Sequence, residues 1–269
     1  MTRLNASEDD RIERLRIVTR GYEMSPQGRV APAQLLRYVE HVRWRTIAHS
    51  DRIPAREFMR LGVVRAQKLE FLLDTTFDVE LEISMWLSRV GKTSLDFSHE
   101  VTRVEDGALV ARSSATVVTL DSDRRPAPVD HRAREYVVTR DATPIERLEE
   151  PPPESAWEQP ILIRPSDEDM QGHVNHARYA DFVEDTRRLC AEARGYGAGS
   201  FDGAPRFFTI SYDEETRVGD ALKARTWAST TTPFAVDIVL VKGEGRIATR
   251  ARVGFSVATV SRPERGSAR

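Results

Sequence analysis

The chain repeats itself, and this internal repeat limits its possible folds more than any other feature. When the sequence is shifted by 144 positions, Gly28 meets Gly172 and the matches continue through the segment that follows. They join Gln27 to Gln171, Val30 to Val174, Ala33 to Ala177, Val39 to Val183, Glu40 to Glu184 and Arg43 to Arg187. Further along, a shift of 141 joins Thr75 to Thr216, Leu81 to Leu222 and Trp86 to Trp227. The sequence therefore predicts two copies of one unit of roughly 120 residues, with a short loop insertion between the two registers.

Each copy contains the same succession of predicted elements. A short strand and a glycine turn precede an amphipathic helix, over residues 31–50 in the first copy and 176–193 in the second. Apolar residues recur there near the helical period, and Pro32 suits the first turn of the first helix. Several long strands follow in each copy. A helix followed by antiparallel strands predicts an α+β fold in which the helix buries its apolar stripe against the sheet. Joining the two sheets edge to edge would remove two exposed edges.

The segment between the copies predicts a linker. It contains EEPPPES, which suits neither a helix nor a central strand. We therefore expect an N-terminal repeat over residues 1–130, a Pro-rich linker over 131–159 and a C-terminal repeat over 160–260. The polar residues 261–269 are expected to form a disordered tail.

Composition argues against several classes of protein. The 269 residues are 40% hydrophobic and 30% charged, which is typical of a soluble globular protein, and the net charge of −2 gives no reason to expect nucleic acid. The only cysteine, Cys190, allows no intrachain disulfide and no cysteine metal cluster, which fits a reducing compartment such as the cytoplasm. The charged N-terminus does not suit a signal peptide, and no apolar run approaches the ~18 residues of a membrane span.

The second copy carries chemically useful residues directly before its helix. In the segment SDEDMQGHVN, Asp169 lies three residues before Gly172, and His173 and Asn175 follow. A carboxylate at such a turn can orient water or attack a substrate directly. The glycine allows close approach of a substrate carbonyl, and a helix N-terminus offers free backbone N–H groups. Asn175 is the predicted N-cap of this helix.

The first copy lacks these groups. Ser25, Arg29 and Ala31 stand where the second copy has its aspartate, histidine and asparagine. We therefore expect one active site per chain, supplied mainly by the second copy, with the first copy as a non-catalytic wall of the substrate pocket. Each residue also has a structural interpretation: Asp169 could be a second capping acid, and His173 could be a turn residue bonded to backbone.

The pattern resembles the double hotdog, in which an antiparallel sheet wraps a long helix, twice. The segment SDEDMQGHVN resembles the D-x-x-G-H-V-N motif that opens the hotdog helix in the thioesterase superfamily. The segment RGYEMSPQGRVAPAQLLRYVEHV resembles the N-terminal repeat of acyl-acyl-carrier-protein (acyl-ACP) thioesterases of the plant and bacterial fatty-acid type. The resemblance implies a tandem hotdog with two long helices, each packed on a shared antiparallel sheet.

The resemblance also implies roles for individual residues. Asp169 matches the family's aspartate, His173 its catalytic histidine, and Gly172 the preceding glycine, a natural backbone donor for an oxyanion. The plant-type enzymes have an asparagine where this chain has Gln171, which keeps the amide but is one methylene longer. Glu215, in the string YDEE, matches a catalytic glutamate at the start of the strand after the helix.

The predicted function is hydrolysis of an acyl-ACP or acyl-CoA thioester to free acid and thiol, as in fatty acid biosynthesis, with Asp169 as base or nucleophile. No cofactor is expected, and the six scattered histidines predict no metal site. The chain would act as a monomer, itself a pseudo-dimer, or as a homodimer. One alternative is a dehydratase-like or hydratase-like lyase of the same fold, although the D-x-N-P-x-H string of hotdog hydratases is absent. Another is a non-catalytic acyl-binding protein, which would not need the acids.

Overall fold

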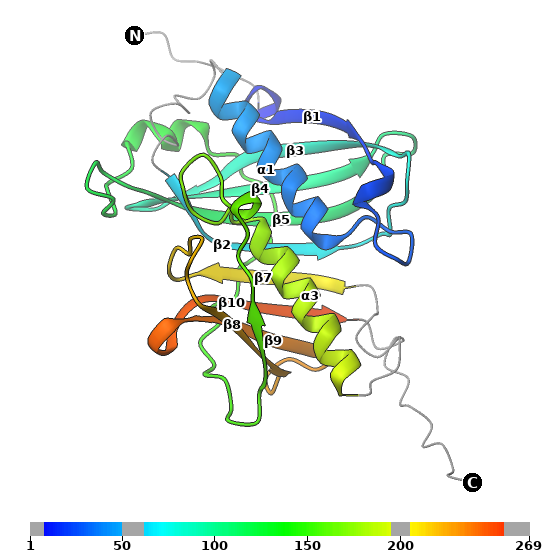
Figure 1. Cartoon of the computed structure of the whole chain (residues 1–269). Coiled ribbons are helices and arrows are strands. Elements are labelled where there is room, and N and C mark those ends of the chain that lie inside the picture. The colour runs from blue at the N-terminus through cyan, green and yellow to red at the C-terminus, as the bar shows by residue number, and fades with distance from the viewer. Residues whose placement is uncertain (1–7, 50–61, 195–204, 256–269) are drawn as a thin grey trace. The chain divides into compact units, whose positions relative to one another are not determined.

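Figure 1 shows the computed structural model of the chain, which describes residues 8–49, 62–194 and 205–255. The chain forms two compact units that meet in sequence between Glu146 and Arg147. This division falls inside the segment predicted as a linker. The predicted disordered tail, residues 261–269, lies outside the described residues.

Among its described residues, the first unit has an antiparallel sheet of five strands and a long helix. The strand order is β1-β3-β4-β5-β2. The main elements are β1 (Glu13–Val18), α1 (Pro32–His49), β2 (Gly62–Phe71), β3 (Glu80–Val90), β4 (Ser94–Arg103) and β5 (Leu109–Thr119). Short 3-10 helices are η1 (Glu8–Arg11), η2 (Gly21–Glu23) and η3 (His131–Tyr136). The helix begins at the proline that the sequence places in its first turn.

The second unit repeats this plan. Its strand order, β7-β10-β9-β8-β6, matches that of the first unit read from the other end. The main elements are β6 (Trp157–Ile161), α3 (Arg178–Ala193), β7 (Pro205–Tyr212), β8 (Leu222–Ala228), β9 (Ala235–Lys242) and β10 (Arg246–Phe255), with the 3-10 helices η4 (Pro165–Asp167) and η5 (Gly243–Gly245). The described elements thus follow the same order in both units, and each unit combines a helix with an antiparallel sheet. The joining of the two sheets edge to edge stays a prediction.

Each helix covers one face of its own sheet, as Figure 1 shows for α1 and α3. In the first unit, the buried side of α1 includes apolar residues at helical spacing, Leu35, Leu36, Val39 and Val42, together with the polar Arg43 and Thr46. Met85 and Leu87 of β3 lie on the opposite side of the strand from Trp86, because side chains alternate along a strand. Trp86 packs with Ile12 and Val138, on the face away from the helix.

The segment predicted as a linker covers the outer faces of the sheets. In the first unit, Val137 forms a parallel bridge to Leu87, and the guanidinium of Arg140 lies 5.7 Å from the Trp86 ring centroid. In the second unit, Ala156 packs with Trp227 and Val239. The segment is therefore part of both cores. Within the described residues, no helix combines the length and apolar character needed to cross a bilayer.

Candidate active site

A tight turn in the second unit carries the predicted catalytic residues. The N–H of Gly172 donates to the carbonyl oxygen of Asp169 at 3.0 Å, and the N–H of Asp169 donates to the carbonyl of His173 at 3.0 Å. Gly172 has a φ of 74°, in the left-handed region that favours glycine. Gly28 has the same φ of 74° and closes the equivalent turn of the first unit by donating to Ser25. The backbone of this turn is thus common to both copies, whereas its side chains differ.

The loop after β7 is fixed beside this turn. The N–H of Val174 donates to the carbonyl of Thr216 at 2.8 Å, and the hydroxyls of Thr216 and Tyr179 lie 2.6 Å apart. This holds Glu215, the residue before Thr216, next to His173. Sequence reasoning missed the positioning roles of Thr216 and Tyr179. The available signal was the match of Thr75 to Thr216, since Thr75 accepts the equivalent backbone bond in the first unit.

His173 lies at the centre of the cluster and is 14% exposed. Its Nδ1 is 3.2 Å from the carbonyl oxygen of Val174, and its Nε2 is 3.3 Å from Oε1 of Gln171. Asp169 Oδ1 lies 3.9 Å from Nδ1, and Glu215 Oε1 lies 3.9 Å from Nε2. Both ring nitrogens therefore face oxygen acceptors, and a proton on either nitrogen is accommodated.

Asp169 is oriented through both of its carboxylate oxygens. Oδ1 accepts the backbone N–H of Gln171 at 2.8 Å, and Oδ2 lies 3.4 Å from Nδ2 of Asn175. The side chain is 19% exposed, so the carboxylate is held in place but still reachable by water. Such a group can take a proton from a bound water or attack an acyl carbon.

Three sequence-based assignments need correction. The N-cap of α3 is Ala177, because the helix begins at Arg178; Asn175 instead accepts the N–H of Ala177 at 2.9 Å in the turn before the helix. The N–H of Gly172 is occupied in its turn, so this group does not serve as the oxyanion donor. Among the residues that the structure describes, the N–H of His173 donates no hydrogen bond, which makes it the available donor.

The third correction concerns Glu215. It lies in the loop three residues beyond the end of β7, not at the start of a strand. Its side chain is 37% exposed, and Oε2 lies 3.7 Å from the guanidinium of Arg217. Glu215 therefore approaches His173 from a loop, held there by the buried Thr216.

The first unit has an ion pair where the second has its histidine and glutamate. Arg29 Nε lies 3.2 Å from Asp74 Oδ2, with both side chains well exposed. These residues match His173 and Glu215 under the shifts of 144 and 141. Ser25 replaces the aspartate. The first unit therefore has the same backbone turn as the candidate site but no imidazole in it.

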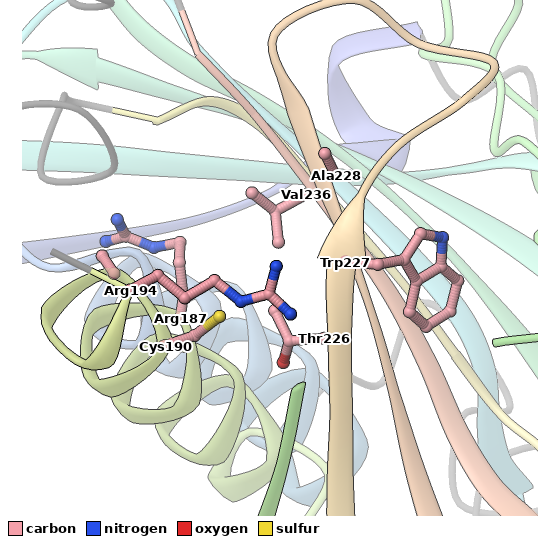
Figure 2. A pocket seen from close by; sticks show the side chains of 8 residues that line it. Arg187, Cys190, Arg194, Thr226, Trp227, Ala228 and Val236 are labelled. Atoms are coloured by element: carbon pink, nitrogen blue, oxygen red, sulfur yellow. The ribbon is translucent and has the colours of Figure 1, made fainter. Parts of the chain in front are cut away.

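A separate cavity of about 50 Å³ lies in the second unit between the later turns of α3 and the sheet (Figure 2). It is lined by Arg187, Cys190, Ala191, Arg194, Thr226, Trp227, Ala228 and Val236, and none of the candidate catalytic residues is among them. Burial raises the pKa of the Cys190 thiol, which disfavours the nucleophilic thiolate. Across the described ranges, no group of three His, Cys, Asp or Glu residues is arranged to hold a metal ion.

Comparison with known proteins adds two family models that match the chain in tandem. Residues 20–153 match the thioesterase-like superfamily, and residues 150–257 match the acyl-ACP thioesterase C-terminal domain. No curated protein sequence matches the chain.

Two solved structures resemble the chain over almost its whole length. The 12:0-ACP thioesterase from Umbellularia californica is 18% identical with a TM-score of 0.76, covering 92% of this chain and 96% of its own. An acyl-ACP thioesterase from Bacteroides thetaiotaomicron is 17% identical with a TM-score of 0.75, covering 93% and 100%. At these identities the likeness shows the fold, which is the predicted hotdog fold.

The fold and the tandem family matches define a thioester hydrolase of the thioesterase-like superfamily. Within that class, the chain belongs to the double-hotdog acyl-ACP thioesterase family.

Proposed function

We propose that the chain hydrolyses acyl-ACP thioesters at the turn formed by Asp169–Gly172, with Asp169 as the general base. The observation that carries this proposal is the convergence of two carboxylates on one imidazole: Asp169 and Glu215 each lie 3.9 Å from a ring nitrogen of His173. The first unit shares the turn but has Arg29 paired to Asp74 instead. The match of the second unit to an acyl-ACP thioesterase domain supports the choice of carrier.

The proposed reaction uses one water molecule. Asp169 takes a proton from the water as its oxygen attacks the thioester carbonyl, and the resulting oxyanion accepts the N–H of His173. The C–S bond then breaks, and imidazolium Nε2 of His173 gives its proton to the leaving sulfur. Asp169 returns its proton to the imidazole. The sum is thioester plus water giving carboxylic acid plus thiol.

Glu215 and Gln171 support His173 in this scheme. Glu215 Oε1 faces Nε2, the nitrogen that donates the proton, and Oε1 of Gln171 fixes the ring orientation. Asn175 holds the second oxygen of Asp169. In the variant in which Asp169 attacks the acyl carbon directly, a mixed anhydride would form and water would cleave it in a second step.

The first experiment is a thiol-release assay with the full chain and acyl groups of several lengths, each presented on ACP and on CoA. We expect release from both carriers, with a higher kcat/KM for acyl-ACP. Saturable binding without release from any thioester would favour the acyl-binding protein. Reversible hydration of an enoyl thioester would favour the lyase.

Arg29→Ala tests whether the first unit takes part in the chemistry. Arg29 occupies the position of the catalytic imidazole, but its exposed ion pair with Asp74 contributes about 0–1 kcal/mol at most. We expect kcat/KM to stay within about twofold of the wild type. The matched variant in the second unit is His173→Ala, which is expected to lose most activity. A loss for Arg29→Ala as severe as that for Asp169→Ala would refute the assignment of one active site to the second unit.

A further inference from the structure

The small cavity of the second unit is lined by two buried polar residues that the proposed chemistry does not use. Arg187 on α3 lines it from the helix, and Thr226 on β8 lines it from the sheet (Figure 2). The two residues are 2% and 1% exposed. Within the described part of the chain, Nη1 of Arg187 and Oγ1 of Thr226 have no hydrogen-bond partner. The cavity is therefore bordered by two hydrogen-bonding groups that no protein atom described here satisfies.

The guanidinium of Arg187 is held in place by contacts that do not involve Nη1. Its Nη2 donates to Oε2 of Glu184 at 2.8 Å, and its Nε donates to Oε1 of the same carboxylate at 3.3 Å. Its Cζ lies 5.2 Å from the ring centroid of Phe255, within the range of a cation–π interaction. A buried donor without a partner opposes folding, and such groups in native proteins commonly bind water or a ligand. We therefore expect Nη1 to have a partner inside the cavity.

The charges around the cavity favour an anion as that partner. Arg194, the C-cap residue of α3, is a second arginine in the lining, and none of the lining residues is acidic. Glu184 balances the charge of Arg187, whereas Nη2 of Arg194 donates to a neutral group, the carbonyl of Ser155, at 3.0 Å. Burial raises the pKa of the Cys190 thiol, which keeps this lining residue neutral. One positive charge is left over, and this suits a ligand with a single negative charge.

We propose that the cavity binds the carboxylate of a small organic acid between Arg187 and Thr226. One carboxylate oxygen accepts the N–H of Nη1, and the other accepts the hydroxyl of Thr226, because an ionised carboxylate accepts hydrogen bonds and donates none. The cavity of about 50 Å³ has room for few atoms, since a single water needs roughly 10–15 Å³. Acetate, with four non-hydrogen atoms, is of this size, and Ala191, Ala228 and Val236 offer its methyl group an apolar wall.

The first unit lacks one of the two donors. Under the shift of 144, Arg43 matches Arg187, and both arginines are buried. Under the shift of 141, Met85 matches Thr226, and its thioether has no hydrogen to donate. The helix arginine is thus common to both copies, whereas the hydroxyl is found in the second copy alone. We therefore expect the carboxylate site only in the second unit.

The test measures binding of acetate and propionate to the full chain, by calorimetry and by the melting temperature, with sodium chloride at matched ionic strength as the reference. Thr226→Val removes the hydroxyl at nearly constant volume. Arg187→Lys removes Nη1 but keeps a positive charge beside Glu184. The matched control is Thr249→Val, which removes another buried, unpartnered hydroxyl of the second unit that does not line the cavity.

We expect saturable binding with a Kd of about 1 mM, because a ligand of so few atoms gains limited free energy. The melting temperature should rise with carboxylate and not with chloride, since the ligand binds the folded state. Each cavity variant should weaken binding about tenfold or more, whereas Thr249→Val should bind as the wild type does.

Three results would each overturn the inference. They are no saturable binding to the wild type, which would leave water as the occupant, an equal response to chloride, and an unchanged affinity in both cavity variants. Thiol release by Thr226→Val should match that of the wild type, because none of the candidate catalytic residues lines the cavity. Binding of the carboxylate is therefore decided independently of the proposed function.

Discussion

Asp169→Asn is expected to lower kcat for thioester hydrolysis about 10²–10⁴-fold, the range lost with a general base. Asparagine has nearly the same shape, so it can still accept the N–H of Gln171 that orients the side chain at 2.8 Å. It cannot take a proton from water. Because Asp169 is partly exposed, its replacement leaves no buried charge unpaired, and the melting temperature should change little.

The measurement is thiol release under saturating and limiting substrate, with the melting temperature recorded for each variant. Ser25→Ala is the matched control, since Ser25 occupies the same place in the turn of the first unit and should be dispensable. A fall in kcat with an unchanged KM would indicate that Asp169 acts in the transition state. Retention of more than about a tenth of the wild-type kcat by Asp169→Asn would exclude the general-base role.

The fold was predictable to the extent that local sequence determines it. Gly28 and Gly172 mark the same left-handed turn, and the helical period after each of them marks the helices. The start of α3 at Arg178 was missed because Asn175 looks like an N-cap. Its side chain in fact closes the preceding turn, since asparagine serves both kinds of structure. The docking of the proline-rich segment also escaped prediction, because it depends on which apolar residues the sheets leave uncovered.

The site was predictable where its residues share one short segment. Asp169 and His173 are four residues apart, so a turn brings them together whatever the rest of the chain does. The approach of Glu215 depends on the bond from Val174 to Thr216, which joins residues 42 positions apart in the sequence. Spacing alone does not reveal such a bond; only the family resemblance pointed to Glu215.

The first unit also holds a buried polar cluster, Gln67, His99 and Ser113, which could not be found in the sequence for a related reason. In the string SLDFSHEV, His99 stands between a serine and a glutamate, so the segment gives no sign that the imidazole faces the core. The other two residues, Gln67 and Ser113, lie on two other strands, β2 and β5. Only the strand register places the three side chains together.

Asp237→Ala is expected to destabilise the second unit by about 3–5 kcal/mol, as when one partner of a buried ion pair is removed. Nε and Nη2 of Arg252 donate to the two carboxylate oxygens of Asp237 at 2.6 and 2.9 Å, and the side chains are 8% and 6% exposed. This bidentate bond raises the pKa of Arg252, so the guanidinium stays charged. Without Asp237 the guanidinium would lose this bidentate bond and would keep its contacts with Glu150, at 3.2 Å, and with the hydroxyl of Thr232.

Urea unfolding monitored by tryptophan fluorescence and by circular dichroism measures this loss, because Trp227 lies directly opposite Asp237 in the sheet. The paired variant Asp237→Leu with Arg252→Met separates two explanations. If the free energy of unfolding falls because the buried charge of Arg252 has lost Asp237, removing both charges should restore most of the stability. Hydrophobic replacements of a buried ion pair are often neutral or stabilising. If the double variant is as unstable as Asp237→Ala, the pair must instead hold the segment around Glu150 against the sheet. In that case Glu150→Gln alone should reproduce a substantial part of the loss.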